Sequence, residues 1–233
     1  MKNKIILGLL MVFSISIFSV KAQNPLSQAT KVEVGIGYVL PFFNKGKELL
    51  RAKGLRDEQQ SYYIDEMGSR KNVGSYSRSS GYTFSIGFYK PIEKVKGLMV
   101  GAIVRNAQTS SNPEKSGYEE AYFFNFITAG VAAKYYPLEK SNLFIKTDFG
   151  IAAVLTKNRY LNSNGEQNFF HQFGIGSVVG FEVGYAFTPF KTKSKAIELK
   201  VGYQLANTRV EVNDIGNDNW RFGALSFGTA FNF

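Results

Sequence analysis

The chain of 233 residues contains no cysteine, a single histidine and only six prolines. Without cysteine it has no disulfide bond, thiolate nucleophile or iron–sulfur cluster. One histidine, His171, excludes a metal site with several histidine ligands. The mean hydropathy of −0.14 is too low for a bundle of membrane helices, although it is compatible with strands that alternate apolar and polar residues across a membrane.

The first 22 residues have the pattern of a secretory signal peptide. Lys2 and Lys4 precede an uncharged, mostly apolar stretch at residues 5–20, and Val20-Lys21-Ala22 supplies a cleavage site before Gln23. The apolar stretch is shorter than the ~20 residues that a spanning helix needs. We therefore expect residues 1–22 to be a signal peptide and residues 23–233 to form one domain, with an uncleaved anchor as the alternative.

Alternation of apolar and polar residues dominates the sequence after residue 30, and no long helical periodicity competes with it. Most of the alternating segments are ten residues or longer, which suits a membrane-spanning strand of ~9–11 residues. The predicted strands are residues 31–40, 81–90, 97–107, 120–136, 143–156, 170–187, 196–208 and 220–233. The pattern predicts an all-β fold, an eight-stranded antiparallel transmembrane up-and-down β-barrel.

Each predicted strand has one face without any charged residue, such as the face of Val32, Val34 and Ile36. The opposite face is small and polar, is rich in glycine and carries eight ionisable residues. These are Glu33, Arg105, Lys134, Lys146, Asp148, Glu182, Glu198 and Lys200. Four cations and four anions fit a narrow lumen in which charges pair, because an unpaired buried charge is costly. We therefore predict that these eight residues form a lumen charge network.

A soluble lipocalin-like barrel also alternates, but with its apolar face around an inner cavity and its polar face toward water. One charge per strand is too few for a water-facing surface. Glycines on the polar face also make sense where a narrow lumen must hold neighbouring large side chains. The sequence therefore favours the membrane barrel.

The connections between predicted strands alternate in length, as in outer-membrane barrels. Residues 91–96, 137–142 and 188–195 form short connections, whereas 108–119, 157–169 and 209–219 are longer and 41–79 is the longest. Both termini are then expected on the periplasmic side, where the short turns lie. Aromatic residues at this level are predicted to form an interfacial girdle: Tyr89, Tyr135, Tyr136, Phe144, Phe187, Phe190, Phe231 and Phe233.

The end of the chain is an alternating strand that carries Phe227, Phe231 and a terminal Phe233. With the secretory start, this ending resembles the eight-stranded outer-membrane β-barrel domains of Gram-negative bacteria, in the broad OmpA/OmpX-like sense. The resemblance implies residence in the cell outer membrane and recognition of these three phenylalanines by the barrel assembly machinery. The signal ending Lys21-Ala22-Gln23 and the Ala-Lys-Tyr-Tyr-Pro run at 133–137 look most like PorT-like barrels of Bacteroidota.

No residue pattern predicts a catalytic, cofactor or metal site. Some outer-membrane lipid hydrolases pair a histidine with a serine on neighbouring strand positions, but the residue two along from His171 is Phe173. The Asn/Asp-rich loop at 213–219 offers oxygen ligands of the kind that calcium prefers. The same residues favour turns for backbone reasons, and the spacing of an EF-hand is absent.

The longest connection, residues 41–79, mixes apolar side chains with eight cations and five anions. Loops of this length usually have a role, so we predict an extracellular loop that contacts a protein partner or the phosphates of lipopolysaccharide. We expect a non-enzymatic outer-membrane protein with a structural, interaction or assembly role. The alternatives are a narrow transport path or small-ligand binder and, less favoured, a lipid-modifying enzyme. Nucleic acid is not an expected partner, because the basic residues are spread over turns and loops.

Overall fold

The computed structural model describes most of the chain from Pro25 to Phe233. The described residues are 25–42, 62–64, 70–72, 80–111, 114–115, 118–138, 141–161, 167–189, 195–212 and 216–233. The predicted signal peptide, most of the 41–79 segment and Phe190 lie outside them. No helix within these ranges is long and apolar enough to cross a membrane.

Nearly all described residues are in β-strands, which follow one short 3-10 helix, η2 (Pro25–Ser27). The strands are β1 (Lys31–Phe42), β2 (Tyr62–Ile64), β3 (Arg70–Asn72), β4 (Ser80–Pro91), β5 (Leu98–Ser111), β6 (Glu114–Lys115), β7 (Tyr118–Tyr135), β8 (Leu143–Leu161), β9 (Gln167–Phe187), β10 (Ala196–Val212) and β11 (Gly216–Asn232).

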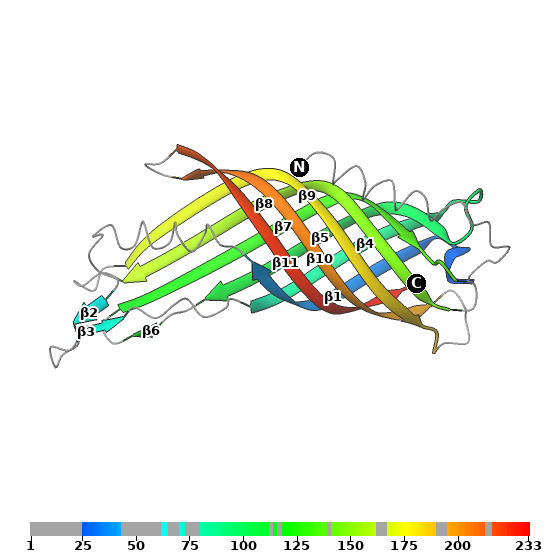
Figure 1. Cartoon of the computed structure of the whole chain (residues 1–233), viewed down its shortest axis with the longest axis horizontal. Coiled ribbons are helices and arrows are strands. Elements are labelled where there is room, and N and C mark those ends of the chain that lie inside the picture. Colours follow the sequence, from blue (N-terminus) through cyan, green and yellow to red (C-terminus); the bar gives the residue numbers. More distant parts are fainter. Residues whose placement is uncertain are drawn as a thin grey trace.

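Eight of these strands close into an antiparallel barrel in the order β5-β4-β1-β11-β10-β9-β8-β7, with β7 pairing back onto β5 (Figure 1). The first and last strands of the chain meet at β1 and β11, where Val32 and Phe233 exchange backbone hydrogen bonds of 2.8 and 3.0 Å. Strand β6 extends the wall beside β7, and β2 pairs with β3 in a separate hairpin. The predicted eight-stranded barrel is confirmed.

The barrel strands are longer at one end than the sequence predicts. Strand β8 has 19 residues and β9 has 21. Much of the predicted connections 108–119, 157–169 and 209–219 is therefore strand, which corrects that expectation. At Glu211, paired with Asn217, the ladder continues through polar residues. Alternating hydrophobicity cannot reveal a strand once it leaves the lipid, because both of its faces then tolerate polar residues.

Large apolar side chains face outward on all eight barrel strands. Examples are Ile36 (63% exposed), Tyr82 (73%), Val131 (67%) and Ile151 (65%). Such a continuous apolar belt is stable only in lipid, and a closed barrel satisfies every strand's backbone hydrogen bonds there. A lipocalin-like barrel would face water with polar residues instead. The protein is therefore a β-barrel of the bacterial outer membrane.

Three aromatic residues of the predicted girdle lie inside the barrel rather than at the lipid interface. Tyr89 and Phe144 are fully buried, and Tyr136 is 5% exposed. Tyr89 belongs to the same face of β4 as buried Ser85, and Phe144 to the same face of β8 as buried Lys146. The expectation of a girdle was wrong for these residues because the alternation of each strand turns their side chains into the lumen. By contrast, Phe187 and Phe233 face outward and are about half exposed.

Candidate functional site

The described residues fill the lumen with three layers of side chains. We call the end of the barrel with the short connections, which the sequence predicts to face the periplasm, the periplasmic end. The layer at this end is apolar and includes Leu26 of η2, which closes it together with Tyr89, Met99 and Phe144. A layer of charged residues lies next, and an apolar layer with several aromatic rings fills the outer part. The barrel interior is thus a packed core, as expected of eight strands.

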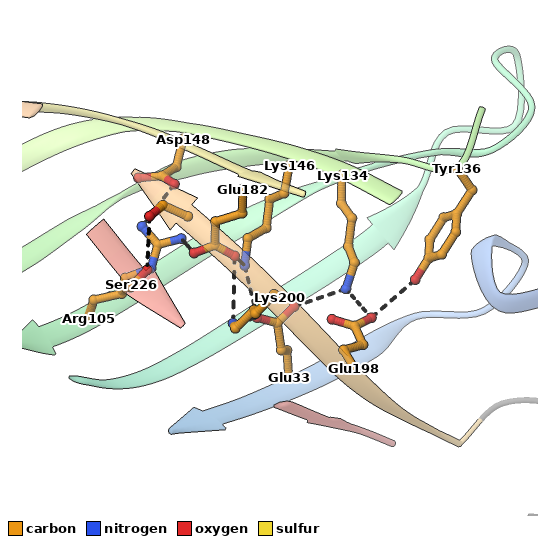
Figure 2. A network of polar contacts seen from close by, with 11 residues as sticks. Glu33, Arg105, Lys134, Tyr136, Lys146, Asp148, Glu182, Glu198, Lys200 and Ser226 are labelled. Carbon is orange, nitrogen blue, oxygen red and sulfur yellow. Dashed lines mark hydrogen bonds and ion pairs between the residues drawn. The ribbon is translucent and has the colours of Figure 1, made fainter. Parts of the chain in front are cut away.

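Glu33 of β1 is the centre of the charged layer. Its carboxylate accepts hydrogen bonds from Lys134 at 3.0 Å and from Lys146 at 2.9 Å. The Nζ atom of Lys200 donates a third at 2.7 Å. Glu33 is completely buried, and the three ammonium groups arrive from three other strands, β7, β8 and β10 (Figure 2). One carboxylate therefore joins four strands of the barrel.

Arg105 and Glu182 extend the layer toward the outer side. The Arg105 guanidinium donates to Asp148 at 2.9 Å and also to Glu182. Glu182 in turn pairs with Lys146, and it lies 3.6 Å from Lys200. These contacts connect β5, β8, β9 and β10 to the same network (Figure 2).

Glu198 forms the periplasmic end of the charged layer. It pairs with Lys134 and accepts a 3.3 Å hydrogen bond from the hydroxyl of Tyr136. The Nζ atom of Lys134 lies 4.4 Å from the ring centroid of Phe144 and 5.5 Å from that of Tyr89. Cation–π contacts therefore supplement the ion pairs where the charged layer meets the periplasmic aromatic rings.

The structure brings the eight charged residues singled out in the sequence into one continuous set of ion pairs. Sequence reasoning missed a ninth buried charge, Lys31, which is 3% exposed at the start of β1. Lys31 is two residues before Glu33 and so shares its inward-facing face. That spacing is the signal that would have found it.

Lumen glycines leave room for these large charged side chains. A methyl group at Gly180 would come within 2.4 Å of the Asp148 carboxylate, and one at Gly202 within 2.7 Å of Glu182. At Gly35 it would meet the hydroxyl of Ser85 at 2.5 Å. Absence of a side chain at these positions is therefore a condition for the ion pairs to form.

The outer layer of the lumen corrects the expectation of a small, polar inward face. Trp220 and Phe222 of β11 pack with Phe124 and Phe126 of β7, with ring centroids 4.7 Å apart for Phe124 and Phe222. These four side chains are at most 7% exposed. Charged residues and glycines mark only part of the inward-facing positions, and apolar side chains occupy the rest.

The other residues singled out in the sequence lie away from the lumen. Exposed His171 is near the outer end of β9 on its outward face, beside Lys157 in the ladder. Phe227, Phe231 and Phe233 all face outward on or after β11, with 5.6 Å between the ring centroids of the last two. Residues 213–215 of the Asn/Asp loop lie outside the described part of the chain, within which no acidic or histidine cluster is arranged to hold a metal ion.

Comparisons with known proteins identify outer-membrane barrels but no close relative. No family model and no curated protein matches the chain. Among solved structures the chain is similar to that of Ail, the attachment invasion locus protein of Yersinia pestis, in complex with the heparin analogue sucrose octasulfate. The two chains are 13% identical, the match covers 88% of this chain and 100% of that chain, and the TM-score is 0.46. Neisserial surface protein A is 18% identical, with 88% and 97% covered and a TM-score of 0.39. OprG from Pseudomonas aeruginosa is 10% identical, with 91% and 99% covered and a TM-score of 0.39.

Proposed function

We propose that the protein is a non-enzymatic component of the outer membrane with a structural, interaction or assembly role. The observation that carries this proposal is the filled lumen. Buried charges and aromatic rings from all eight barrel strands occupy the described interior, and η2 covers the periplasmic end with Leu26. A barrel packed in this way is a rigid mount, so its partners are expected to bind outside it.

The 41–79 segment is the proposed partner-binding element. It connects β1 to β4 and contains the short hairpin of β2 and β3. Its sequence combines apolar residues, such as Phe42 and Phe43, with an excess of lysine and arginine. Apolar anchors surrounded by basic residues suit a protein partner or a phosphate-bearing surface.

The test is replacement of residues 44–76 by a short Gly/Ser linker. Insertion should be unaffected, because the cost of closing a loop depends only weakly on its length. Association with the partner should be lost. Mass spectrometry of the proteins that co-purify with the barrel measures this loss. The matched control replaces residues 162–166, another outer connection, by a linker of equal length. Full rescue of a gene deletion by the barrel without residues 44–76 would refute the proposal.

Lipopolysaccharide is the proposed lipid partner, and two exposed arginines support it. Arg209 of β10 and Arg221 of β11 face outward just beyond the apolar belt, which ends on these strands near Leu205 and Leu225. In the ladder Arg209 is opposite Asn219, and Arg221 is opposite Asn207. Two guanidinium groups at the boundary of the belt are well placed for lipid phosphates.

We also propose a PorT-like affiliation, with a cleaved signal peptide and recognition of the last strand by the barrel assembly machinery. In the Ala-Lys-Tyr-Tyr-Pro run, Lys134 and Tyr136 point into the lumen and meet at Glu198. The run thus carries two residues that hold the charged layer together. Amino-terminal sequencing of the mature protein should begin at Gln23; an intact Met1 would refute the cleavage.

A small-ligand binder is the second candidate, and the apolar outer layer of the lumen favours it. Trp220 lies in that layer and is the only tryptophan of the chain. Titration with a small aromatic compound would therefore report entry into the layer through tryptophan fluorescence. A saturable change in emission would favour the ligand binder, whereas unchanged emission would favour the filled, structural barrel.

A further inference from the structure

The apolar belt is much shorter on one side of the barrel than on the opposite side. On β4 the outward-facing apolar residues begin at Phe88 and end at Tyr82, six residues away. On β9 they extend from Phe187 to Phe173, fourteen residues away, with a serine as the one polar interruption. Three strands separate β4 from β9 in either direction around the ring, so the short and the long side lie diametrically opposite.

The strands next to β4 and β9 repeat this difference. On β5 the outward-facing apolar residues lie at 98–104 and are followed by half-buried Asn106 and exposed Gln108. On β8 the outward face is uncharged and mostly apolar over 143–155. The difference in belt length is therefore a property of two sides of the barrel and not of a single irregular residue.

The belt on β4 and β5 is too short for a bilayer of ordinary thickness. A strand rises ~3.3 Å per residue and is tilted by ~35–45°, so each residue covers ~2.5 Å of the membrane normal. The belt is then ~15 Å tall on β4 and β5 and ~35 Å tall on β9, whereas the apolar band of such barrels is ~25 Å tall. A tilt of the whole barrel raises the belt on one side and lowers it on the other, but it lengthens neither.

The missing apolar surface lies in the outer leaflet. Leu98 begins β5 and Phe187 ends β9, and both adjoin short connections at the periplasmic end, so the two belts start at the same level. Asn106 is eight residues along β5 from Leu98, and Val179 is eight residues along β9 from Phe187. An amide on the short side is therefore at the depth of an aliphatic side chain on the long side.

Hydrocarbon cannot satisfy the amide of Asn106. Its carboxamide oxygen has no hydrogen-bond partner among the described residues, and acyl chains offer neither donors nor acceptors. Exposed Gln108 and Ser110 are the next two outward-facing positions on β5. Water and lipid head groups can hydrogen-bond to all three side chains. The chemistry of this face thus favours head groups at the level of Asn106.

We propose that the β4–β5 side of the barrel thins the outer leaflet around it and prefers lipids with short acyl chains as neighbours. A bilayer adapts to a short apolar stretch by thinning, at a modest cost per ångström of mismatch. Burying polar side chains in hydrocarbon is the more expensive alternative. On the β8–β9 side the long belt keeps the bilayer at full thickness, so the membrane is asymmetric around the barrel.

Spin labels at the two matched depths test the proposal directly. The chain has no cysteine, so Asn106→Cys and Val179→Cys each give one labelling site in the full chain refolded into dioleoylphosphatidylcholine vesicles. Collisions with a water-soluble nickel chelate should be severalfold more frequent at position 106 than at position 179, whereas collisions with oxygen dissolved in hydrocarbon should favour position 179.

Two other outcomes of the labelling experiment would overturn the proposal. If oxygen reaches both positions equally and the nickel chelate reaches neither, the bilayer has its full thickness on both sides. If position 106 is protected from both reagents and labels on different copies couple magnetically, a second protein covers this face in place of thinned lipid.

A change in belt length gives an independent measurement. Asn106→Leu combined with Gln108→Leu extends the apolar face of β5 by four residues, so this variant fits a thicker bilayer. Relative to the unmodified protein, its equilibrium constant for unfolding in urea should fall about tenfold more in dioleoyl- than in dilauroylphosphatidylcholine. The control is Ser177→Leu, which adds a leucine within the long belt of β9 and should have the same effect in both lipids. Equal lipid dependence of the two variants would overturn the proposal.

Discussion

Glu33 of β1 accepts a 2.9 Å hydrogen bond from Lys146 of β8, the strand diametrically opposite in the barrel. Three strands separate β1 from β8 in either direction around the ring. The two residues are 113 positions apart in the sequence. The ion pair therefore spans the full lumen and fixes the separation of opposite walls.

Replacement of Glu33 by leucine should strongly destabilise the barrel. The change leaves three buried ammonium groups without the carboxylate that they share, and breaking a buried ion pair costs ~3–5 kcal/mol. Urea titration of the refolded protein in lipid bilayers measures the loss. Val34→Leu, at the neighbouring lipid-facing position, is the control. Adding Lys146→Met to Glu33→Leu should cost less than the sum of the two single changes; strict additivity would contradict the pairing.

A lysine at Val183 should destabilise the protein for a different reason. Val183 faces lipid on β9, and a lysine on the lipid face near the bilayer midplane costs ~2–4 kcal/mol. The same urea titration detects the change, with Val183→Ala to separate lost packing from added charge. If lysine and alanine at this position are tolerated equally, Val183 does not face hydrocarbon.

The terminal phenylalanine should matter for assembly more than its inward neighbour. Phe233 faces outward and its backbone pairs with Val32, whereas Asn232 is buried toward the lumen. We expect Phe233→Asp to reduce the amount of folded barrel in the outer membrane, as judged by migration of unboiled samples in gel electrophoresis. Asn232→Ser should have the smaller effect. The reverse order would mean that the assembly machinery reads another feature of this strand.

Alanine at Gly180 should disturb the charged layer although it adds only a methyl group. The methyl would displace the Asp148 carboxylate, which Arg105 holds at 2.9 Å. Overpacking of this kind costs ~1–3 kcal/mol. Gly223→Ala is the matched control, because the closest approach of its methyl, 2.6 Å, is to the hydroxyl end of the exposed Tyr203 side chain and not to a residue of the charged layer. Thermal unfolding midpoints of the two variants should therefore differ clearly.

The fold was predictable because alternation reports directly on lipid contact. Each membrane-spanning strand has an outward face that must be apolar, so both the number of strands and their facing follow from the residues. The pattern weakens where strands leave the lipid, which is why β8 and β9 extend beyond their predicted ends. Position in a strand also assigns Glu33 and Lys146 to the inward face.

The partners of the inward charges could not be predicted in the same way. Whether Lys146 reaches Glu33 depends on the stagger of the strands around the ring, which no local pattern encodes. The three misplaced aromatics, Tyr89, Tyr136 and Phe144, show the opposite case. Their alternate positions in the sequence already placed them on the inward face, but aromatic residues near a predicted membrane interface suggested a girdle. The burial of Leu26 could not be predicted, because the short 3-10 helix before the first strand has no hydrophobic periodicity.

The sharing of Glu33 makes closure of the ring a cooperative event. Strands β7, β8 and β10 each bring one lysine to a carboxylate that only β1 supplies. An incomplete ring with β4, β5 and β7–β11 in place would hold those lysines with too few acids. A ring that lacks β1 is therefore electrostatically disfavoured, and the first strand of the barrel in the sequence completes the charge balance of strands that follow it.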